Sequence, residues 1–222
     1  MTTLLPHLEV ETNPKPDASI IWLHGLGADG HDFEPIIEQL NLPHGAAIRF
    51  IFPHAPSLAV TINNGMVMPA WYDILEMSIE REVDIVQLKQ SVDAVIAFIN
   101  NETQRGISSD RIIIAGFSQG GAVAFEAALS FPQKLAGLLA LSTYFATKDT
   151  IEYHPKNQGL AIAIHHGEND SILPIKLADI SSSLLLAKGY KVDLTRYPME
   201  HSICREQIAD ISNWFSDVLQ LK

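Results

Sequence analysis

Residues 111–121 read RIIIAGFSQGG, and this stretch decides the fold. Three consecutive β-branched residues, 112–114, are typical of a strand that is covered on both faces. Residues 119–130 are mostly small and apolar, which predicts a tightly packed helix. Only residues 116–118 separate the two elements, so the turn must be sharp. Gly116 and Gly120 lack the β-carbons that would collide in such a turn.

Ser118 lies inside this turn. A serine flanked by glycines two positions away on each side, between a strand and a helix, is the nucleophile-elbow pattern. In that pattern the hydroxyl is held exposed above the end of a sheet. The simpler interpretation is that Ser118 only caps the following helix. The pattern also occurs by chance, so the rest of the chain must decide between the two.

The remainder of the chain alternates between strand and helix patterns. Strands are predicted at 19–23, 47–52, 111–115, 137–141, 161–165 and 191–196, and helices at 33–40, 80–102, 119–130, 174–188 and 204–219. This alternation predicts an α/β fold with a mainly parallel central sheet and helices on both faces. We expect a single domain spanning residues 1–222. The short connections leave no room for a large cap domain.

Composition narrows the possible partners. The net charge of −11 and the lack of a basic cluster argue against nucleic acid and anionic membranes. A single cysteine, Cys204, predicts a reducing, cytoplasmic location. We expect no signal peptide and no stable membrane insertion, because no apolar run approaches the roughly 20 residues needed to cross a bilayer. Despite nine histidines, no HExxH-type spacing appears, so no metal site is expected.

Two later strand ends carry reactive side chains. Asp170 lies in HHGENDSILP (165–174), and His201 lies in YPMEHSIC (197–204). The chain order Ser118, Asp170, His201 is that of an α/β-hydrolase catalytic triad. In such a triad the histidine takes the serine proton, and the carboxylate fixes the imidazole tautomer.

Each assignment has a competitor. Asp170 could instead start a helix, which would leave Glu168 or Asp193 as the acid. The nearest rivals of His201 are His165 and His166, although packing is the more natural role at the end of a strand.

An oxyanion hole needs backbone N–H donors near the serine. The Gln119 N–H at the start of the predicted helix is one candidate. The Leu26 N–H is the second, in the glycine-rich turn of IIWLHGLGADG (20–30). GLGADG alone suggests phosphate binding, but it fits neither the P-loop nor the complete dinucleotide pattern.

Together these motifs identify a family. The stretches HGLGADG (24–30), PHAP (53–56), TINNGMVMPAWYD (61–73), GFSQGG (116–121) and HGENDSILP (166–174), with the late His201, occur in one order. The chain, from about residue 7 to 218, resembles the carboxylesterase and acyl-protein thioesterase family of small α/β-hydrolases, also described as lysophospholipase-like.

The resemblance implies the α/β-hydrolase fold and hydrolysis of esters or thioesters without metal or cofactor. It implies a triad of Ser118, Asp170 and His201, and an oxyanion hole of the Leu26 and Gln119 amides. Relatives more often have an aliphatic residue directly after the aspartate, where this chain has Ser171. That departure affects the solvation of Asp170 rather than the triad itself.

The segment after PHAP is expected to shape the substrate site. Asn63-Asn64-Gly65 is a tight-turn signal and predicts a short hairpin or flap. Substrate-binding residues are expected among the apolar side chains in and after it, namely Met66, Met68, Trp71 and Leu75. The alternative is that these residues fill the core.

We therefore expect a serine esterase or thioesterase for short to medium acyl chains. Its substrate would be a small-molecule or lipid ester, or an acylated protein, and the chain would be a monomer or homodimer. Rival interpretations are a catalytically silent binding protein of the same fold, a metallohydrolase, and a dienelactone- or peptidase-type hydrolase. Dienelactone hydrolases commonly use a cysteine nucleophile, whereas Cys204 lies three residues after His201, where packing is its more natural role.

Overall fold

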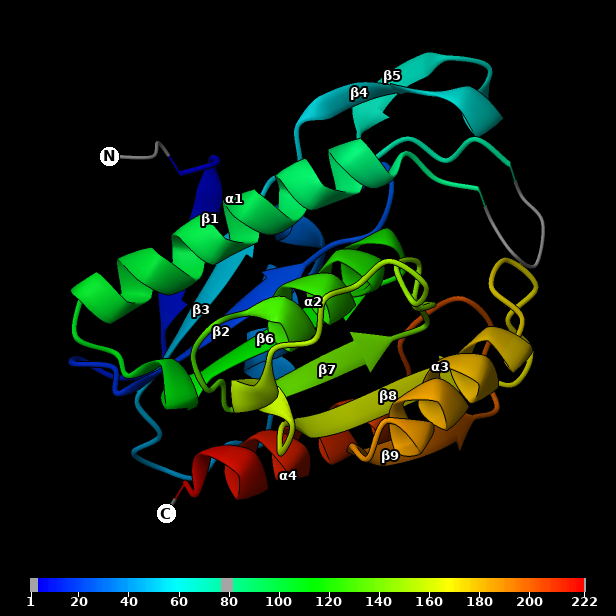
Figure 1. The fold of residues 1–222 in the computed structure, drawn as a ribbon. Helices are drawn as coiled ribbons and strands as arrows, with labels where there is room; N and C mark the ends of the chain where they lie inside the picture. The colour runs from blue at the N-terminus through cyan, green and yellow to red at the C-terminus, as the bar shows by residue number, and fades with distance from the viewer. Residues whose placement is uncertain (1–3, 77–81, 222) are drawn as a thin grey trace.

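The computed structural model describes residues 4–76 and 82–221. A seven-stranded sheet in the order β1-β3-β2-β6-β7-β8-β9 runs through the molecule (Figure 1). Its strands are β1 (His7–Glu11), β2 (Ala18–Leu23), β3 (Ile48–Pro53), β6 (Ile112–Phe117), β7 (Gly137–Leu141), β8 (Ala161–Gly167) and β9 (Lys191–Tyr197). Every neighbouring pair is parallel except β1 with β3. The predicted α/β-hydrolase fold with a mainly parallel sheet is therefore confirmed.

Four α-helices cover the sheet. They are α1 (Ile85–Gln104), α2 (Gln119–Ser130), α3 (Lys176–Ala187) and α4 (Arg205–Leu219). Apolar residues of α1, α2 and α3 share one core cluster, and those of α4 belong to a second cluster across the sheet. Within the described ranges, no helix is both long and apolar enough to cross a membrane.

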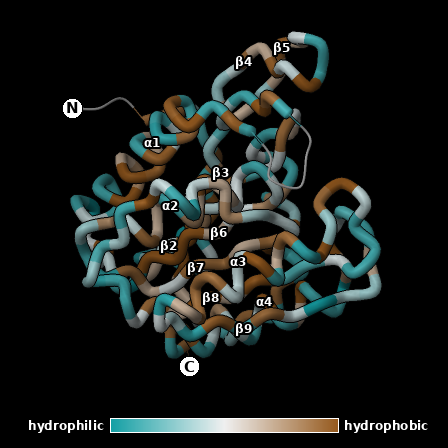
Figure 2. The backbone as a smooth tube through the Cα atoms, turned by 45° about the vertical axis from the view of Figure 1, so that its right-hand side comes forward, coloured by the Kyte–Doolittle hydropathy of each residue, from teal (hydrophilic) through white to brown (hydrophobic). Residues whose placement is uncertain are grey.

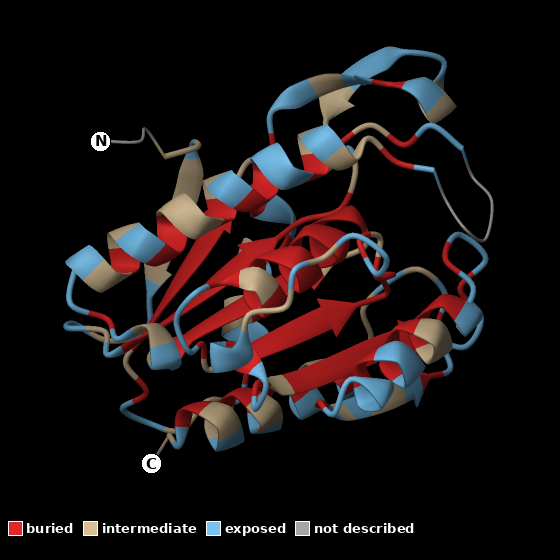
Figure 3. Cartoon of the chain, viewed as in Figure 1, coloured by how far each residue is buried: buried red, intermediate tan, exposed pale blue. Residues whose placement is uncertain are grey.

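The central strands are apolar on both faces because both faces are covered. On β2, Ile21 and Leu23 belong to the first cluster, whereas Ile20 and Trp22 belong to the second. Figure 2 shows hydrophobic residues along these strands, and Figure 3 shows that the strands are buried. This is the continuous apolar pattern that predicted a parallel sheet.

Two predictions about local structure need correction. Residues 33–40 form no α-helix; this region holds short 3₁₀ segments, η1 (Gly30–Asp32) and η2 (Glu34–Gln39). The segment is too short to gain much from α-helical bonds, and such short connectors commonly adopt 3₁₀ geometry. The long helix begins at Ile85, where Asp84 accepts a hydrogen bond from the Gln87 N–H, and not at residue 80. Residues 77–81 lie outside the described ranges.

Strand β1 was not predicted from the sequence. This strand pairs antiparallel with β3 at the sheet edge, and its residues are partly or fully exposed. Its sequence, HLEVE, does alternate polar and apolar residues, so the signal of a half-buried strand was present, although it spans only five residues.

The predicted hairpin is confirmed. Strands β4 (Ser57–Val60) and β5 (Met66–Pro69) pair antiparallel and project beyond α1 (Figure 1). Between them a 3₁₀ turn, η3 (Thr61–Asn63), leads into Asn64 and Gly65, which both have positive φ. Asp73 fixes the turn of the hairpin, because its carboxylate accepts bonds from the Thr61 N–H and hydroxyl at 2.7 and 2.6 Å.

A buried carboxylate ties the long helix to the sheet. Glu102 of α1 is fully buried and pairs with Arg49 of β3 at 2.7 Å and with Arg105 at 2.9 Å. It also accepts a hydrogen bond from the Ser19 hydroxyl of β2. Three elements thus converge on one charge that water cannot reach.

We expect Glu102→Ala to lower the free energy of unfolding by about 3–5 kcal/mol, because the buried Ser19 hydroxyl and Arg49 Nη1 would lose their acceptor, and Arg49 would keep only its pairs with the more exposed Glu9 and Glu11. Asp179→Asn is the matched control, since its 2.6 Å pair with Arg196 is exposed and worth less than about 1 kcal/mol. Urea unfolding of both variants measures the difference. Equal losses would show that the Glu102 network does not stabilise the fold.

Candidate active site

The turn at Ser118 has the geometry of a nucleophile elbow. Ser118 lies between β6 and α2 with φ +54° and ψ −118°, a strained conformation for a residue with a side chain. A β-carbon on Gly116 would lie 2.4 Å from the Gly120 oxygen, and one on Gly120 would lie 2.5 Å from the His24 oxygen. Neither position can therefore carry a side chain without moving the backbone.

The Ser118 hydroxyl does not cap α2. Its side chain makes no capping bond; instead Oγ lies 3.0 Å from His201 Nε2. The backbone of Ser118 is held on both sides, because its N–H donates to the Leu141 oxygen and its carbonyl accepts from the Thr143 hydroxyl. The helix-cap interpretation is therefore excluded in favour of a hydroxyl that faces a base.

The two partners come from the ends of neighbouring strands. Asp170 follows β8 and His201 follows β9, and Asp170 Oδ2 lies 2.6 Å from His201 Nδ1. The other oxygen, Oδ1, accepts the N–H groups of Ile172 and Leu173 at 2.9 and 2.7 Å. This arrangement places a proton on Nδ1 and leaves Nε2 free to accept the serine proton.

The surroundings of Asp170 keep it ionised. Burial would raise the pKa of this carboxyl, but the hydrogen bonds from His201 and the Leu173 amide outweigh burial and hold the pKa below its usual range. The competing acids do not reach the site: Glu168 and Asp193 are exposed, and neither bonds to His201.

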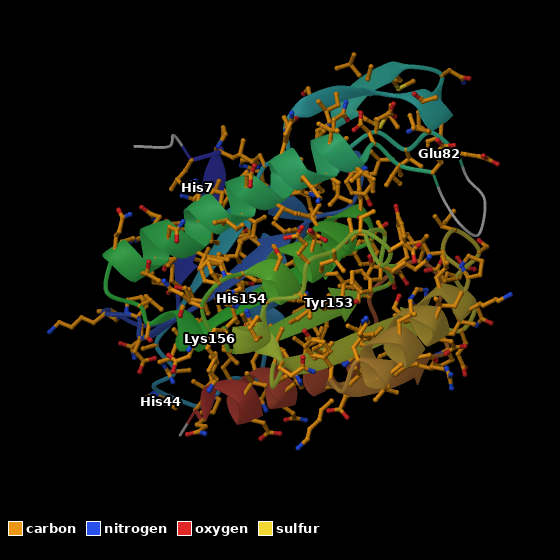
Figure 4. The ribbon with its side chains drawn as sticks, viewed as in Figure 1. His7, His44, Glu82, Tyr153, His154 and Lys156 are labelled. Carbon is orange, nitrogen blue, oxygen red and sulfur yellow. The ribbon has the colours of Figure 1, made fainter. Side chains whose placement is uncertain are left out.

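The rival histidines have other partners. The Nε2 of His166 lies 2.7 Å from the Leu173 oxygen, so His166 holds the loop that carries Asp170. His165 contacts Tyr197, whose hydroxyl lies 3.3 Å from His165 Nδ1. Other histidines are scattered, as His7, His44 and His154 show in Figure 4. Within residues 4–76 and 82–221, no cluster of three or more metal-binding side chains occurs.

The two expected oxyanion donors point toward the same space. The Gly25 oxygen lies 2.7 Å from His24 Nδ1 and also accepts the Ala28 N–H. Because a trans peptide directs its carbonyl and its N–H to opposite sides, the Leu26 N–H of this peptide is turned away from those bonds. In the described part of the chain, neither Leu26 nor Gln119 donates its N–H to a protein acceptor, and both residues line a cavity with Ser118 and His201.

Side chains beneath the site hold both donors in place. His24 Nε2 accepts the Ala55 N–H at 3.1 Å, and burial lowers the pKa of His24, which keeps the ring neutral. The side-chain amide of Gln119 accepts the backbone N–H of Trp71 at 2.8 Å and donates to the backbone oxygen of Tyr72 at 2.6 Å. Trp71 in turn donates its indole N–H to the His24 oxygen at 2.8 Å. These bonds join the glycine-rich turn and the start of α2 into one rigid unit.

The four residues expected to bind substrate, Met66, Met68, Trp71 and Leu75, do not line the cavity beside Ser118. Trp71 is 1% exposed and supports the site from below, because its backbone and indole N–H groups are used in the bonds just described. Met66 and Leu75 are 63% and 41% exposed and do not line the cavity. The Met68 sulfur lies 3.2 Å from the Asn63 amide nitrogen, within the hairpin.

Other residues form the cavity, which has a volume of about 310 Å³. Its apolar wall comes from both sides of Ser118 and includes Leu26, Ile62, Ile74, Phe117, Ile172 and Leu173. Of these, only Leu26 was expected at the site. Two signals could have identified others: Ile172 and Leu173 lie two and three residues after Asp170, and Ile62 and Ile74 lie in the turn of the hairpin and just after it.

Burial lowers the pKa of His165 to about 4, below the ordinary value of 6.5. The unfolded chain therefore binds more protons between these values, so the stability that neutral His165 provides is present above about pH 6.5 and is lost as the pH falls toward 4. We expect His165→Gln to reduce the loss of unfolding free energy between about pH 6.5 and pH 4 by about 3 kcal/mol, as measured by urea unfolding across this pH range. His31→Gln, at an exposed position, should keep the wild-type slope, and an unchanged slope in His165→Gln would contradict the assignment.

Comparisons with known proteins agree with this geometry. The family model described as Phospholipase/Carboxylesterase matches residues 6–219. Acyl-protein thioesterase 1 of Neurospora crassa is 36% identical, over 96% of this chain and 92% of the relative. A protein of the same name from Cryptococcus neoformans is 33% identical, over 99% of this chain and all of the relative.

Solved structures show the same fold. Arabidopsis thaliana SOBER1 superposes with a TM-score of 0.85 at 28% identity, covering 91% of this chain and 99% of that one. Zea mays acyl-protein thioesterase 2 gives a TM-score of 0.83 at 25% identity, covering 97% and 99%. The chain belongs to the phospholipase/carboxylesterase family of α/β-hydrolases.

Proposed function

We propose that this protein is a serine hydrolase that cleaves carboxylic esters or thioesters of short to medium acyl chains through an acyl-enzyme intermediate. The observation that carries the proposal is the continuous hydrogen-bonded series from Ser118 Oγ through His201 to Asp170, at 3.0 and 2.6 Å. The names of the relatives, acyl-protein thioesterases, support the same chemistry.

Acylation begins when Ser118 Oγ attacks the substrate carbonyl while His201 Nε2 removes its proton. The carbonyl oxygen becomes an oxyanion between the Leu26 and Gln119 N–H groups, and one such donor is worth about 3 kcal/mol to the transition state. As the tetrahedral intermediate collapses, the bond to the leaving group breaks and His201 returns the proton to the leaving oxygen or sulfur. Asp170 stabilises the imidazolium throughout.

Deacylation repeats these steps with water. His201 removes a proton from the water molecule that attacks the acyl carbonyl, and the second intermediate collapses to release the acid. Ser118 then recovers its proton from His201. Atoms balance without a metal or cofactor, because one water adds across the ester or thioester bond.

The apolar cavity supports a preference for an acyl chain. Ile62, Ile74 and Leu173 present aliphatic surface beside the serine, and burial of each methylene favours binding by about 0.8 kcal/mol. A volume of about 310 Å³ suits a short or medium chain rather than a long one.

Thioesters place a lower demand on His201 than oxygen esters do. A thiol has a pKa near 8.5, so a thiolate leaves more readily than an alkoxide and needs its proton less urgently. We propose an S-acylated protein or a lipid ester as the natural substrate class. A cytoplasmic location belongs to this proposal and is supported by the single free cysteine, Cys204.

Two alternatives receive less support. A silent binding protein has no need for the strained Ser118 conformation or for the bond to His201. A cysteine hydrolase would need its thiol at the elbow, whereas Cys204 lies at the start of α4 as its N-cap residue.

We expect Ser118→Ala to lower kcat/KM for p-nitrophenyl esters by a factor of about 10³ or more, because the nucleophile is lost. The substrates run from two to sixteen carbons, and wild-type activity should peak at a short or medium chain and persist in chelator. Ser183→Ala, on the exposed surface of α3, should behave as wild type. Full activity in Ser118→Ala would rule out the proposed nucleophile, and loss of activity in chelator would favour a metallohydrolase.

A further inference from the structure

A second hollow adjoins the first on the far side of His201. Its volume is about 380 Å³, and it lies between the η1–η2 segment and the start of α4. Phe33, Ile36, Ile203 and Ile208 give it apolar walls. The two hollows share three lining residues, Asp32, Phe117 and His201. They therefore adjoin each other, with His201 between them.

The two hollows differ in which catalytic groups they reach. The first is lined by Leu26, Ser118 and Gln119 as well as His201, whereas the second reaches His201 alone. The tetrahedral carbon on Ser118 carries three other groups: the oxyanion, the acyl chain and the leaving group. The oxyanion occupies the Leu26 and Gln119 donors, and the leaving atom must face His201 Nε2 to receive its proton. A group that extends beyond His201 therefore enters the second hollow.

The resting charge that lines this hollow is negative. Asp32 is exposed on the shared wall, and among the residues that the structure describes no lysine or arginine lines either hollow. Glu34 and Glu38 follow on the same segment, and residues 33–40 contain no basic side chain. At the start of α4, Arg205 and Glu206 have opposite charges and offset each other. The local field therefore favours a cation beside an apolar surface.

We propose that the second hollow is the leaving-group subsite and that it selects thiols or alcohols that carry a positive charge close to the reacting atom, with Asp32 as the residue that recognises the charge. Apolar contact with Ile36 and Ile208 holds the body of the leaving group. This inference rests on the proposed serine-hydrolase function and adds the substrate class to it.

The test uses three thioesters of one hexanoyl group that differ only in the thiol. Thiocholine is the cation, 3,3-dimethylbutanethiol is its neutral isostere, and 3-mercaptopropanoate is the anion. Thiol release gives kcat/KM, which reports acylation, the step in which the leaving group is present. The readout is the quotient of the cationic over the neutral kcat/KM, compared between enzymes, because intrinsic differences in thiol reactivity then cancel.

We expect Asp32→Asn to lower this quotient about threefold to fivefold, the upper part of the range for an exposed charge pair, and to raise the relative rate of the anionic substrate. Glu38→Gln is the matched control, since it removes an exposed charge from the same segment without touching the hollow, and its quotient should change by less than half as much. Gln39→Trp places bulk at the rim of the hollow. It should disfavour thiocholine relative to a methanethiol ester while leaving the preferred acyl length unchanged.

Three outcomes would overturn the inference. The quotient could stay constant in Asp32→Asn, it could fall equally in Glu38→Gln, or Gln39→Trp could shift the acyl length instead of the leaving-group preference. In each case hydrolysis that depends on Ser118 would leave the proposed function intact. Loss of the proposed function is a separate result, in which Ser118→Ala hydrolyses all three thioesters as fast as wild type.

Discussion

The close approach of α2 to the ends of β2 and β6 is the constraint on which the site depends. Hypothetical β-carbons at Gly116 and Gly120 would collide with backbone oxygens at 2.4 and 2.5 Å, so the sharp turn between β6 and α2 exists only because both are glycine. The turn forces Ser118 into a positive φ and raises its hydroxyl above the sheet. The free N–H groups at the start of α2 then face the same space as the serine. One piece of backbone geometry thus positions both the proposed nucleophile and half of the proposed oxyanion hole.

The parallel sheet supplies the other groups. Because β6, β8 and β9 run in the same direction, the loops that follow them lie at one edge, and Ser118, Asp170 and His201 meet there although they are far apart in sequence. Hydrogen bonds between buried polar groups support them from below. The side chains of Gln119 and Trp71 link the elbow to the glycine-rich turn. Replacing either side chain with an apolar one would leave its buried hydrogen-bonding partner unpaired.

Much of this was accessible from the sequence, for identifiable reasons. Six strands of the sheet and the proposed triad could be predicted because strand patterns and strand-end motifs are local signals, whereas the alternation in the edge strand β1 extends over only five residues. The residues that line the cavity could not be predicted in the same way. Flexible and aromatic residues such as Met66 and Trp71 resemble lining residues in composition, but Met66 faces solvent and Trp71 is buried beneath the site. The three-dimensional path of the hairpin and of the segment after it brings Ile62 and Ile74 to the cavity instead.

The most direct test of the account is covalent labelling with an alkyl fluorophosphonate, which reacts only with an activated serine and does not depend on how fast the acyl-enzyme turns over. Peptide mass spectrometry should find one phosphonate per chain, on Ser118, in proportion to lost activity. His201→Gln should label far more slowly at equal time, because Ser118 would lack its base. Labelling at another residue, or unchanged labelling in His201→Gln, would contradict the central claim that His201 and Asp170 activate Ser118.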